Sequence, residues 1–362
     1  MKKLHKIMIC VAMAMTLVAC NQDTTNKKAE VETKKEPEKV VYYSPLRHEE
    51  TKEDISKNKI YAVMIDNHDD ARPQSGLDPC DVIYEYRAEG EYTRYMLLFQ
   101  QNYPDVIGPV RSARPYFVDT AKEYNAVYIH WGGSEAGLAE IHKRNVVDLD
   151  GIALEGIIFH RNKDVGKFAP HNGYIALPEM IEYLNKKDIN TMDNNASLSF
   201  KEDDEKAKGI DVNEIELNFN PRYKTKFIYN ANTNKYQYNR QGEVVIDESS
   251  GVEIGTTNVL VLFQKAVVAG PKGTLKLDNI GSGKGLFLQG GKLSEITWEK
   301  ANEDARTIFK DEDGNEIKFY PGKTFISVVD DESHVFYEKP IDEDTYSNQN
   351  NNGENAQKVE NK

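Results

Sequence analysis

Short apolar runs and amphipathic runs alternate along the first half of the chain. Apolar runs typical of buried strands cover residues 60–65, 81–86, 94–99 and 126–131, and runs with helical periodicity cover residues 116–124, 136–143 and 178–186. Alternation of this kind predicts helices packed on a sheet. We therefore expect an α/β domain over residues 51–190, followed by a polar connection over residues 191–212.

The pattern changes after this connection, where short runs are broken by Asn, Gly and Asp. Runs of this type cover residues 226–230, 258–264, 294–300 and 325–329. Their spacing is typical of antiparallel hairpins, and the pair Asp313-Gly314 is a strong hairpin-turn signal. Residues 213–341 are therefore expected to form a β-rich domain. The predicted fold class is α+β or mixed α/β, with a layered sheet-and-helix domain first and the β-rich domain second.

The two ends of the chain do not carry the pattern of a folded core. Residues 1–20 combine early lysines, an apolar stretch and the sequence LVAC, which is typical of a lipoprotein signal peptide whose lipobox cysteine, Cys20, is acylated. Residues 21–50 and 342–362 are polar or charged, so we expect a disordered tether and a disordered tail. Acyl chains on Cys20 would hold the protein on the outer face of the cell membrane.

Charge and cysteine content narrow the possible partners. The formal net charge of the 362-residue chain is −13, which opposes spreading along nucleic acid through the overall field. Of the three cysteines, Cys10 lies in the signal and Cys20 is the lipidation site, so Cys80 is left without an intrachain disulfide partner. We expect a buried thiol at Cys80.

A group of polar residues directly follows the first apolar run. Asp66, Asn67, His68 and Arg72 occupy this position, and ligands collect outside the carboxyl ends of strands in sheets with crossover helices. The same residues also serve as strand-ending turns and helix caps. A binding site and a simple turn both remain open.

The next two runs add charged residues to the same region. In a strand, Glu85 and Glu89 would share one face with Arg87 because side chains alternate with a period of two, and Arg94 begins the following run. This face is either part of a site or a solvated surface of paired charges.

Two arginines flank a serine just before a predicted helix. Arg111, Ser112 and Arg114 precede Pro115, which is typical of the first helical turn, and Ser112 is a candidate cap. Cations are disfavoured at a helix N-terminus, where the backbone dipole already presents positive charge. We therefore expect a site for a negative group. The alternative is internal neutralisation by Glu85 and Glu89.

A second strand-to-helix junction follows the fourth apolar run. Gly132, Gly133 and Ser134 lie between strand and helix, where backbone N–H groups can bind a phosphate or carboxylate. His130 ends the strand, either as a general base or as a core histidine. No histidine pair has the i, i+4 spacing of a helical zinc site, so no metal ligand set and no cofactor are predicted, although Asp66 or Glu89 is available to a divalent cation.

Several of these runs occur together in one known family. The sequences MIDNHDDARPQSG, IGPVRSARPYF, HWGGS and GSGKGLFLQGG resemble the YerB-like lipoprotein family of Gram-positive bacteria. The resemblance covers nearly all of the expected folded chain. It implies a lipidated, surface-exposed protein with a mixed α/β domain followed by a β-rich domain, and it implies no particular reaction.

Two hypotheses about function follow. In the first, the N-terminal domain binds or processes an anionic envelope group, namely a phosphate, pyrophosphate or carboxylate of a cell-wall or lipid-linked ligand, with arginines gripping its oxygens. In the second, the protein is a non-catalytic envelope adaptor that docks an unknown protein partner. The sequence does not decide whether the protein is an enzyme.

Overall fold

The computed structural model describes residues 40–338 except for residues 91, 190–197, 203 and 271–272, and the described residues from 41 onward belong to a single unit. The predicted signal with Cys20, residues 21–39 of the tether and the tail over residues 342–362 lie outside the described residues. Among the described helices, none combines the length and apolar character needed to cross a bilayer.

An eleven-stranded sheet is the centre of this unit, and it contains strands from both halves of the sequence. In spatial order it consists of β10 (Ile210–Asp211), β20 (Lys292–Lys300), β19 (Gly281–Gln289), β16 (Asn258–Phe263), β22 (Thr324–Val329), β4 (Val82–Arg87), β5 (Thr93–Phe99), β3 (Tyr61–Asp66), β6 (Val127–His130) and β7 (Asp148–Asp150), with β21 (Ile308–Lys310) on the outer side of β20. Strand β22 is parallel to both β16 and β4, with Ile326 beside Tyr84. The N-terminal and C-terminal regions are therefore joined through backbone hydrogen bonds.

A second sheet of six strands comes entirely from the C-terminal half. It consists of β14 (Glu243–Val244), β13 (Lys235–Arg240), β12 (Tyr223–Asn230), β11 (Glu214–Asn220) and β23 (Val335–Tyr337), with β15 (Gly255–Thr256) on β13. Three strand pairs are separate from both sheets: β1 (Tyr42–Tyr43) with β2 (Glu50–Thr51), β8 (His160–Arg161) with β9 (Gly173–Tyr174), and β17 (Ala266–Val268) with β18 (Leu275–Leu277). The predicted fold class, mixed α+β with a β-rich C-terminal half, is confirmed.

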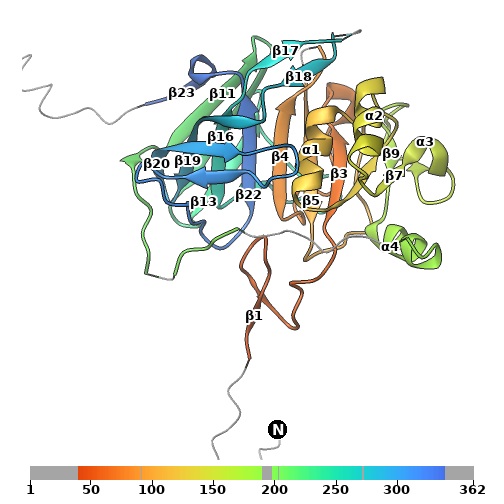
Figure 1. The fold of residues 1–362 in the computed structure, drawn as a ribbon, viewed down its shortest axis with the longest axis horizontal. Coiled ribbons are helices and arrows are strands. Elements are labelled where there is room, and N and C mark those ends of the chain that lie inside the picture. The colour runs from red at the N-terminus through yellow and green to blue at the C-terminus, as the bar shows by residue number, and fades with distance from the viewer. Residues whose placement is uncertain (1–39, 91, 190–197, 203, 271–272, 339–362) are drawn as a thin grey trace, which may run out of the picture. The chain divides into compact units, whose positions relative to one another are not determined.

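The described α-helices all lie in the N-terminal half. They are α1 (Pro115–Glu123), α2 (Glu135–Lys143), α3 (Gly151–Leu154) and α4 (Leu177–Lys186). The 3₁₀ turns η1 (Asp69–Ala71) and η3 (Glu332–His334) also lie in the described residues. Helix α1 starts at Pro115, as its sequence predicts, because proline needs no N–H acceptor in the first turn. Figure 1 shows α1 lying over the part of the large sheet formed by β4, β5 and β3, with α2 beside α1 on the side of β7.

Alternation along the strands divides the hydrophobic residues into two cores. On β3, Val63 and Ile65 face one core, and Ala62 and Met64 face the other, because successive side chains point to opposite faces. The first core packs the large sheet against the six-stranded sheet, and the second packs it against α1 and α2. Both faces are covered, which explains why the runs in the sequence are almost continuously apolar.

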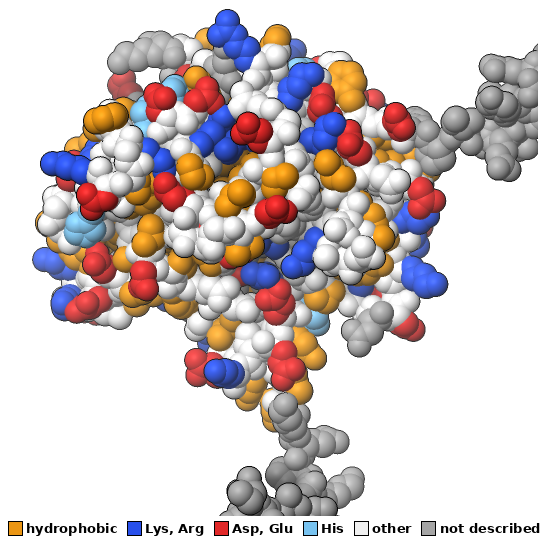
Figure 2. Space-filling view, turned by 180° about the vertical axis from the view of Figure 1, so that it is seen from behind, with side chains coloured by type: hydrophobic (Ala, Val, Ile, Leu, Met, Phe, Trp, Pro, Cys, Tyr) orange, Lys and Arg blue, Asp and Glu red, His pale blue; other side chains and the backbone are white. Residues whose placement is uncertain are grey.

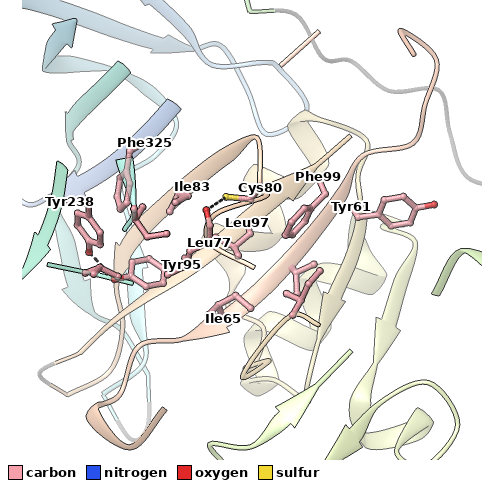
Figure 3. Close-up of a cluster of buried hydrophobic side chains, with 14 of the residues drawn as sticks. Tyr61, Ile65, Leu77, Cys80, Ile83, Tyr95, Leu97, Phe99, Tyr238 and Phe325 are labelled. Carbon is pink, nitrogen blue, oxygen red and sulfur yellow. Dashed lines mark hydrogen bonds between the residues drawn. The ribbon is translucent and has the colours of Figure 1, made fainter. Parts of the chain in front are cut away.

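Cys80 lies in the first of these cores, as expected. Figure 3 shows its thiol directed at the carbonyl oxygen of Leu77, and the sulfur lies 3.1 Å from that oxygen. The side chain is fully buried, and burial raises the pKa of the thiol to about 12. A thiol in this environment is a packing residue.

Ordered structure extends into two ranges that the sequence assigns to a tether and a connection. Strands β1 and β2 pair within residues 42–51, so the predicted tether range includes part of the folded unit at its end. Strand β10 pairs with β20 and lies inside the predicted connection. The surface seen in Figure 2 carries acidic and basic side chains interspersed with hydrophobic ones.

Candidate functional site

Charged side chains meet at one edge of the large sheet. Strands β3 and β6 are parallel and end at this edge, and β5, which is antiparallel to β3, begins there. Loops that follow these strands bring in residues from distant parts of the sequence. We use the term carboxyl-edge cluster for Asp66, His68, Glu89, Arg94, Arg111, Arg114 and His171. The edge is the one at which ligands are expected in such sheets.

Glu89 binds two of the three arginines in this cluster. Its carboxylate accepts hydrogen bonds from Nε and Nη2 of Arg114, the second at 2.8 Å, and lies 3.3 Å from Nη2 of Arg94. Burial alone would raise the pKa of Glu89, but hydrogen bonding by Arg114 and the charge of Arg94 hold it below its usual value. For Arg114 the geometry therefore fits the alternative to an anion site, internal neutralisation, and Glu89 provides it.

Asp66 binds the third arginine and a histidine. Its Oδ2 accepts a hydrogen bond from Nδ1 of His171 at 2.7 Å and lies 3.3 Å from Nε of Arg111. Its Oδ1 accepts from the backbone N–H of His68 at 3.1 Å. Burial opposes ionisation, but these hydrogen bonds and the charge of Arg111 together lower the pKa of Asp66. The carboxylate is therefore charged and fixed in orientation.

His68 caps the short η1 turn and stacks against two rings. Its Nδ1 accepts a hydrogen bond from the backbone N–H of Asp70 at 3.1 Å. Its ring centroid lies 4.5 Å from that of His171, with an interplanar angle of 24°, and 4.3 Å from that of Tyr92. The His68 side chain is 30% exposed, so this part of the cluster is open to solvent.

The three arginines of the cluster are not equally neutralised. Arg114 also donates to the carbonyl of Ala113 at 2.7 Å, and its side chain is 11% exposed. Arg111 makes an ion pair with Asp66 but, within the part of the chain that the structure describes, its buried Nε has no hydrogen-bond acceptor. Its side chain is 23% exposed. The carboxylates of Asp66 and Glu89 lie among the three guanidinium groups, and a third carboxylate, that of Asp70, lies 3.5 Å from His68 at the exposed side of the cluster.

Asn67 and Arg72, predicted as neighbours of Asp66 in one site, point instead toward the six-stranded sheet. Asn67 is fully buried, and its Oδ1 accepts hydrogen bonds from Gln74 at 2.9 Å and from Arg240 at 2.8 Å. Arg72 donates to the carbonyl of Asn67 at 2.8 Å and lies over the ring of Tyr223. Both side chains therefore connect the β3 loop to the C-terminal half.

Glu85 is also separated from the carboxyl-edge cluster. It does not share a face with Glu89, because β4 ends at Arg87 and Glu89 lies in the turn that follows. The Oε1 atom of Glu85 accepts hydrogen bonds from Thr93 at 2.7 Å and Tyr223 at 3.1 Å, beneath the six-stranded sheet. Burial raises the pKa of Glu85 to about 7. Glu85 therefore takes no part in the alternative interpretation, in which it would help to neutralise the two arginines.

Ser112 does not cap α1. Its hydroxyl donates to the carbonyl oxygen of Trp131 at 3.0 Å, and the N-cap residue of α1 is Arg114, which makes no side-chain capping bond. Ser112 therefore fixes the loop that carries Arg111 against the end of β6. Arg161 covers the other side of this junction, with its guanidinium carbon 3.8 Å from the centroid of the Trp131 ring.

The junction after β6 already has internal partners for its polar groups. His130 is fully buried and bonds through Nε2 to Asp148 at 3.0 Å and through Nδ1 to the carbonyl of Gly132 at 2.8 Å. The N–H of Gly132 donates to Asp150 at 2.7 Å, and the N–H of Ser134 donates to Ala113.

The interpretation of His130 as a core histidine fits this geometry. Ser134 caps α2 by accepting from the N–H of Gly137 at 3.0 Å, while Gly133 pairs with Ala113. In this structure, the N–H groups of Gly132 and Ser134, which we expected to bind an anion, are engaged by the protein itself.

His171 is the residue of the cluster that sequence reasoning did not select. It lies in the loop between β8 and β9, 105 residues after Asp66, with no motif around it. The sequence around it shows only a histidine next to a proline in a polar stretch, which does not indicate a site. The hydrogen bond to Asp66 depends on tertiary structure alone.

Comparisons with known proteins agree with the architecture. Residues 47–190 match the N-terminal domain model, and residues 215–326 the C-terminal domain model, of the family described as Protein of unknown function (DUF3048). The chain is 28% identical over 334 residues to the putative lipoprotein YerB of Bacillus subtilis (strain 168), covering 91% of this chain and 96% of that protein. It is also similar to the crystal structure of YerB from Bacillus subtilis, with a TM-score of 0.74 and 26% identity over 82% of this chain and 99% of that one.

Proposed function

We propose that this chain, which belongs to the two-domain, YerB-like lipoprotein family, binds an anionic cell-envelope group at the carboxyl-edge cluster. The family carries no assigned activity, so the proposal depends on the residues of the cluster. Acylation of Cys20, the signal peptide before it and attachment to the outer face of a Gram-positive cell membrane are part of the same proposal. The ligand would be a phosphate, pyrophosphate or carboxylate of a wall polymer or a lipid-linked molecule.

The incomplete neutralisation of Arg111 is the observation that supports this proposal. A guanidinium presents five N–H donors in a planar fork that matches the oxygens of phosphate and carboxylate. Asp66 engages Arg111 at 3.3 Å, but its shorter bond, at 2.7 Å, goes to His171. An external anion would therefore add hydrogen bonds that Asp66 does not supply.

A thermal-shift measurement in EDTA-containing buffer tests the proposal. The full chain is heated with inorganic phosphate, pyrophosphate or glycerol phosphate, and with sodium chloride at matched ionic strength. A ligand at about a hundred times its Kd stabilises the folded state by about 2.7 kcal/mol. We expect Arg111→Ala to abolish the shift. Arg306→Ala is the matched control, because Arg306 forms a partly exposed ion pair with Glu316, in the C-terminal half.

The anion-binding proposal fails if none of the three anions raises the melting temperature beyond the salt control, or if Arg111→Ala retains the full shift. Arg111→Lys adds a second measurement, since it keeps the charge and loses the planar fork. Weaker but measurable binding by this variant would separate charge attraction from bidentate recognition.

A docking function is the second candidate, and one surface of the C-terminal half favours it. A groove of about 370 Å³ lies beside β23, a strand at the edge of the six-stranded sheet. Its walls include Phe263, Ile296 and Phe336, and Phe336 is 52% exposed. Lys284, Glu295 and Glu332 also line it, and a groove of mixed character beside an edge strand suits an extended peptide. If a protein partner binds here, we expect Phe336→Ser to abolish its copurification with the chain and to leave the melting temperature unchanged.

A further inference from the structure

We propose that His68, Asp70 and His171 bind a divalent transition-metal ion of the zinc or cobalt type. Each residue contributes one candidate ligand atom, and these atoms all lie within 4.8 Å of one another. Two imidazoles and one carboxylate suit such ions, whereas magnesium and calcium prefer oxygen ligands alone. The ligands come from the η1 turn and from the loop between β8 and β9, so local sequence spacing does not reveal them.

Two electron-rich atoms already face each other in this group. The Nδ1 atom of His68 accepts a hydrogen bond from the N–H of Asp70, so it carries a lone pair rather than a proton. The carboxylate Oδ2 of Asp70 lies 3.5 Å from the same nitrogen. Nitrogen and oxygen ligands of one tetrahedral zinc ion, each about 2.0–2.1 Å from the metal, are about 3.3 Å apart. The observed separation therefore fits two ligands of a single ion.

His171 supplies a third ligand whose orientation is fixed from behind. Its Nδ1 donates to the buried carboxylate of Asp66 at 2.7 Å, which leaves the lone pair on Nε2. Metal-binding histidines commonly donate their second ring N–H to a carboxylate, which fixes the tautomer and raises the basicity of the ligand. The Asp66 side chain is 5% exposed, so this support belongs to the protein interior rather than to a mobile surface residue.

Side-chain rotations are needed to bring the three ligands to metal-binding distance. The Asp70 side chain is 73% exposed and can rotate without disturbing the core. The His68 side chain is 30% exposed, and its ring must rotate out of its stack on His171, where the interplanar angle is 24°, so that both ring nitrogens can point at one ion. Metal binding would exchange the capping hydrogen bond from the Asp70 N–H for coordination of His68 Nδ1.

Three protein ligands leave a coordination position for a ligand from outside. This open position is the feature that distinguishes catalytic from structural zinc sites. Arg111 contacts Asp66, the residue that orients His171, so the proposed metal site and the proposed anion site share one buried carboxylate. The metal proposal rests on the proposed function only for the identity of this external ligand.

Cobalt titration of the full chain tests the site directly. Metal is removed with EDTA, the chelator is dialysed away, and Co²⁺ alone is added in phosphate-free buffer while visible absorption is recorded. We expect one Co²⁺ per chain with a d–d spectrum typical of mixed nitrogen and oxygen ligands. His171→Ala and Asp70→Asn should each weaken binding by tenfold or more. His160→Ala is the matched control, because His160 pairs with Glu179 on the surface and its side chain is 51% exposed.

The outcomes separate this proposal from anion binding. The metal site is refuted if the unaltered chain binds no Co²⁺, or if His171→Ala and Asp70→Asn bind it as tightly as His160→Ala does. Circular dichroism of each variant checks folding, and the exposed position of Asp70 keeps the test valid if His171→Ala unfolds. Phosphate binding is measured in EDTA and depends on Arg111, so either proposal can fail while the other holds.

Discussion

The imidazole of His171 donates its Nδ1–H to Oδ2 of Asp66 at 2.7 Å, across 105 residues of sequence. This bond connects the loop between β8 and β9 to the end of the central strand β3. Because the same carboxylate contacts Arg111, one buried aspartate orients both the proposed metal ligand and the proposed anion-binding residue.

Asp66→Asn should therefore weaken metal binding without removing a ligand. Loss of a carboxylate behind a metal-binding histidine reduces affinity by about 10–100-fold. The measurement is Co²⁺ titration of the full chain. Asp148→Asn is the control, because Asp148 makes the comparable bond to His130, which lies outside the cluster. Equal affinities in the two variants would contradict the role assigned to Asp66.

Glu89→Gln should lower the free energy of unfolding by about 3 kcal/mol, because it leaves two largely buried arginines without their shared carboxylate. Urea unfolding at neutral pH measures this change. The comparison variant is Glu316→Gln, whose partly exposed pair with Arg306 should contribute less than about 1 kcal/mol. A loss for Glu89→Gln no larger than that for Glu316→Gln would show that Arg94 and Arg114 do not depend on Glu89.

Glu85→Gln should remove part of the pH dependence of stability. Burial raises the pKa of Glu85 from 4.5 to about 7, so the folded chain holds this proton more tightly than the unfolded chain does. The stabilisation is complete below about pH 4.5 and is lost as pH rises through 7. Relative to Glu85→Gln, the unaltered chain should lose on the order of 3 kcal/mol between pH 4.5 and pH 8. Parallel stability curves for the two chains would be inconsistent with a buried, protonated Glu85.

Cys80 should not react with thiol reagents in the folded protein. With a pKa of about 12, roughly one thiol in 10⁴ is ionised at pH 8, and the sulfur is also buried. Cys10→Ser and Cys20→Ser are combined so that Cys80 is the single cysteine in the chain. Colour release from an aromatic disulfide reagent should then require urea. Fast stoichiometric reaction in native buffer would mean that the core around Leu77 opens readily.

The two halves of the sequence should unfold together, because β22 hydrogen-bonds to β4 on one side and to β16 on the other. The two tryptophans report on the two halves separately, Trp131 at the end of β6 and Trp298 on β20. Single-tryptophan chains made by Trp131→Phe and Trp298→Phe can be compared by fluorescence in urea. We expect coincident midpoints. Midpoints that differ by more than the effect of each substitution on stability would indicate two independently folding domains.

The local sequence pattern predicts where strands and helices lie, but it does not predict which strands pair with one another. The apolar runs at residues 60–65 and 94–99 match β3 and β5 within one residue, and Pro115 marks the start of α1, because these features depend on neighbouring residues only. The pairing of β22 with β4 joins residues more than 200 positions apart and has no local signal.

The candidate site also contains residues that local sequence predicts and one residue that only the tertiary structure reveals. Asp66, His68 and Arg111 were selected because they follow a strand or precede a helix, and they lie together. Glu85 was misassigned because the period of two was extended beyond Arg87, where the strand ends and Gly90 turns the chain with a φ of +76°. His171 needed the tertiary fold.

During protein synthesis, β4 is made long before β22, its parallel neighbour in the sheet. Strand β4 is made early, but its parallel neighbour ends at Val329, close to the end of the described chain. Until those residues leave the ribosome, one edge of β4 has no partner, and an open strand edge invites pairing with other chains. We expect a chain truncated before residue 324 to aggregate rather than persist as a smaller folded protein, because it lacks the strand that covers this edge of β4.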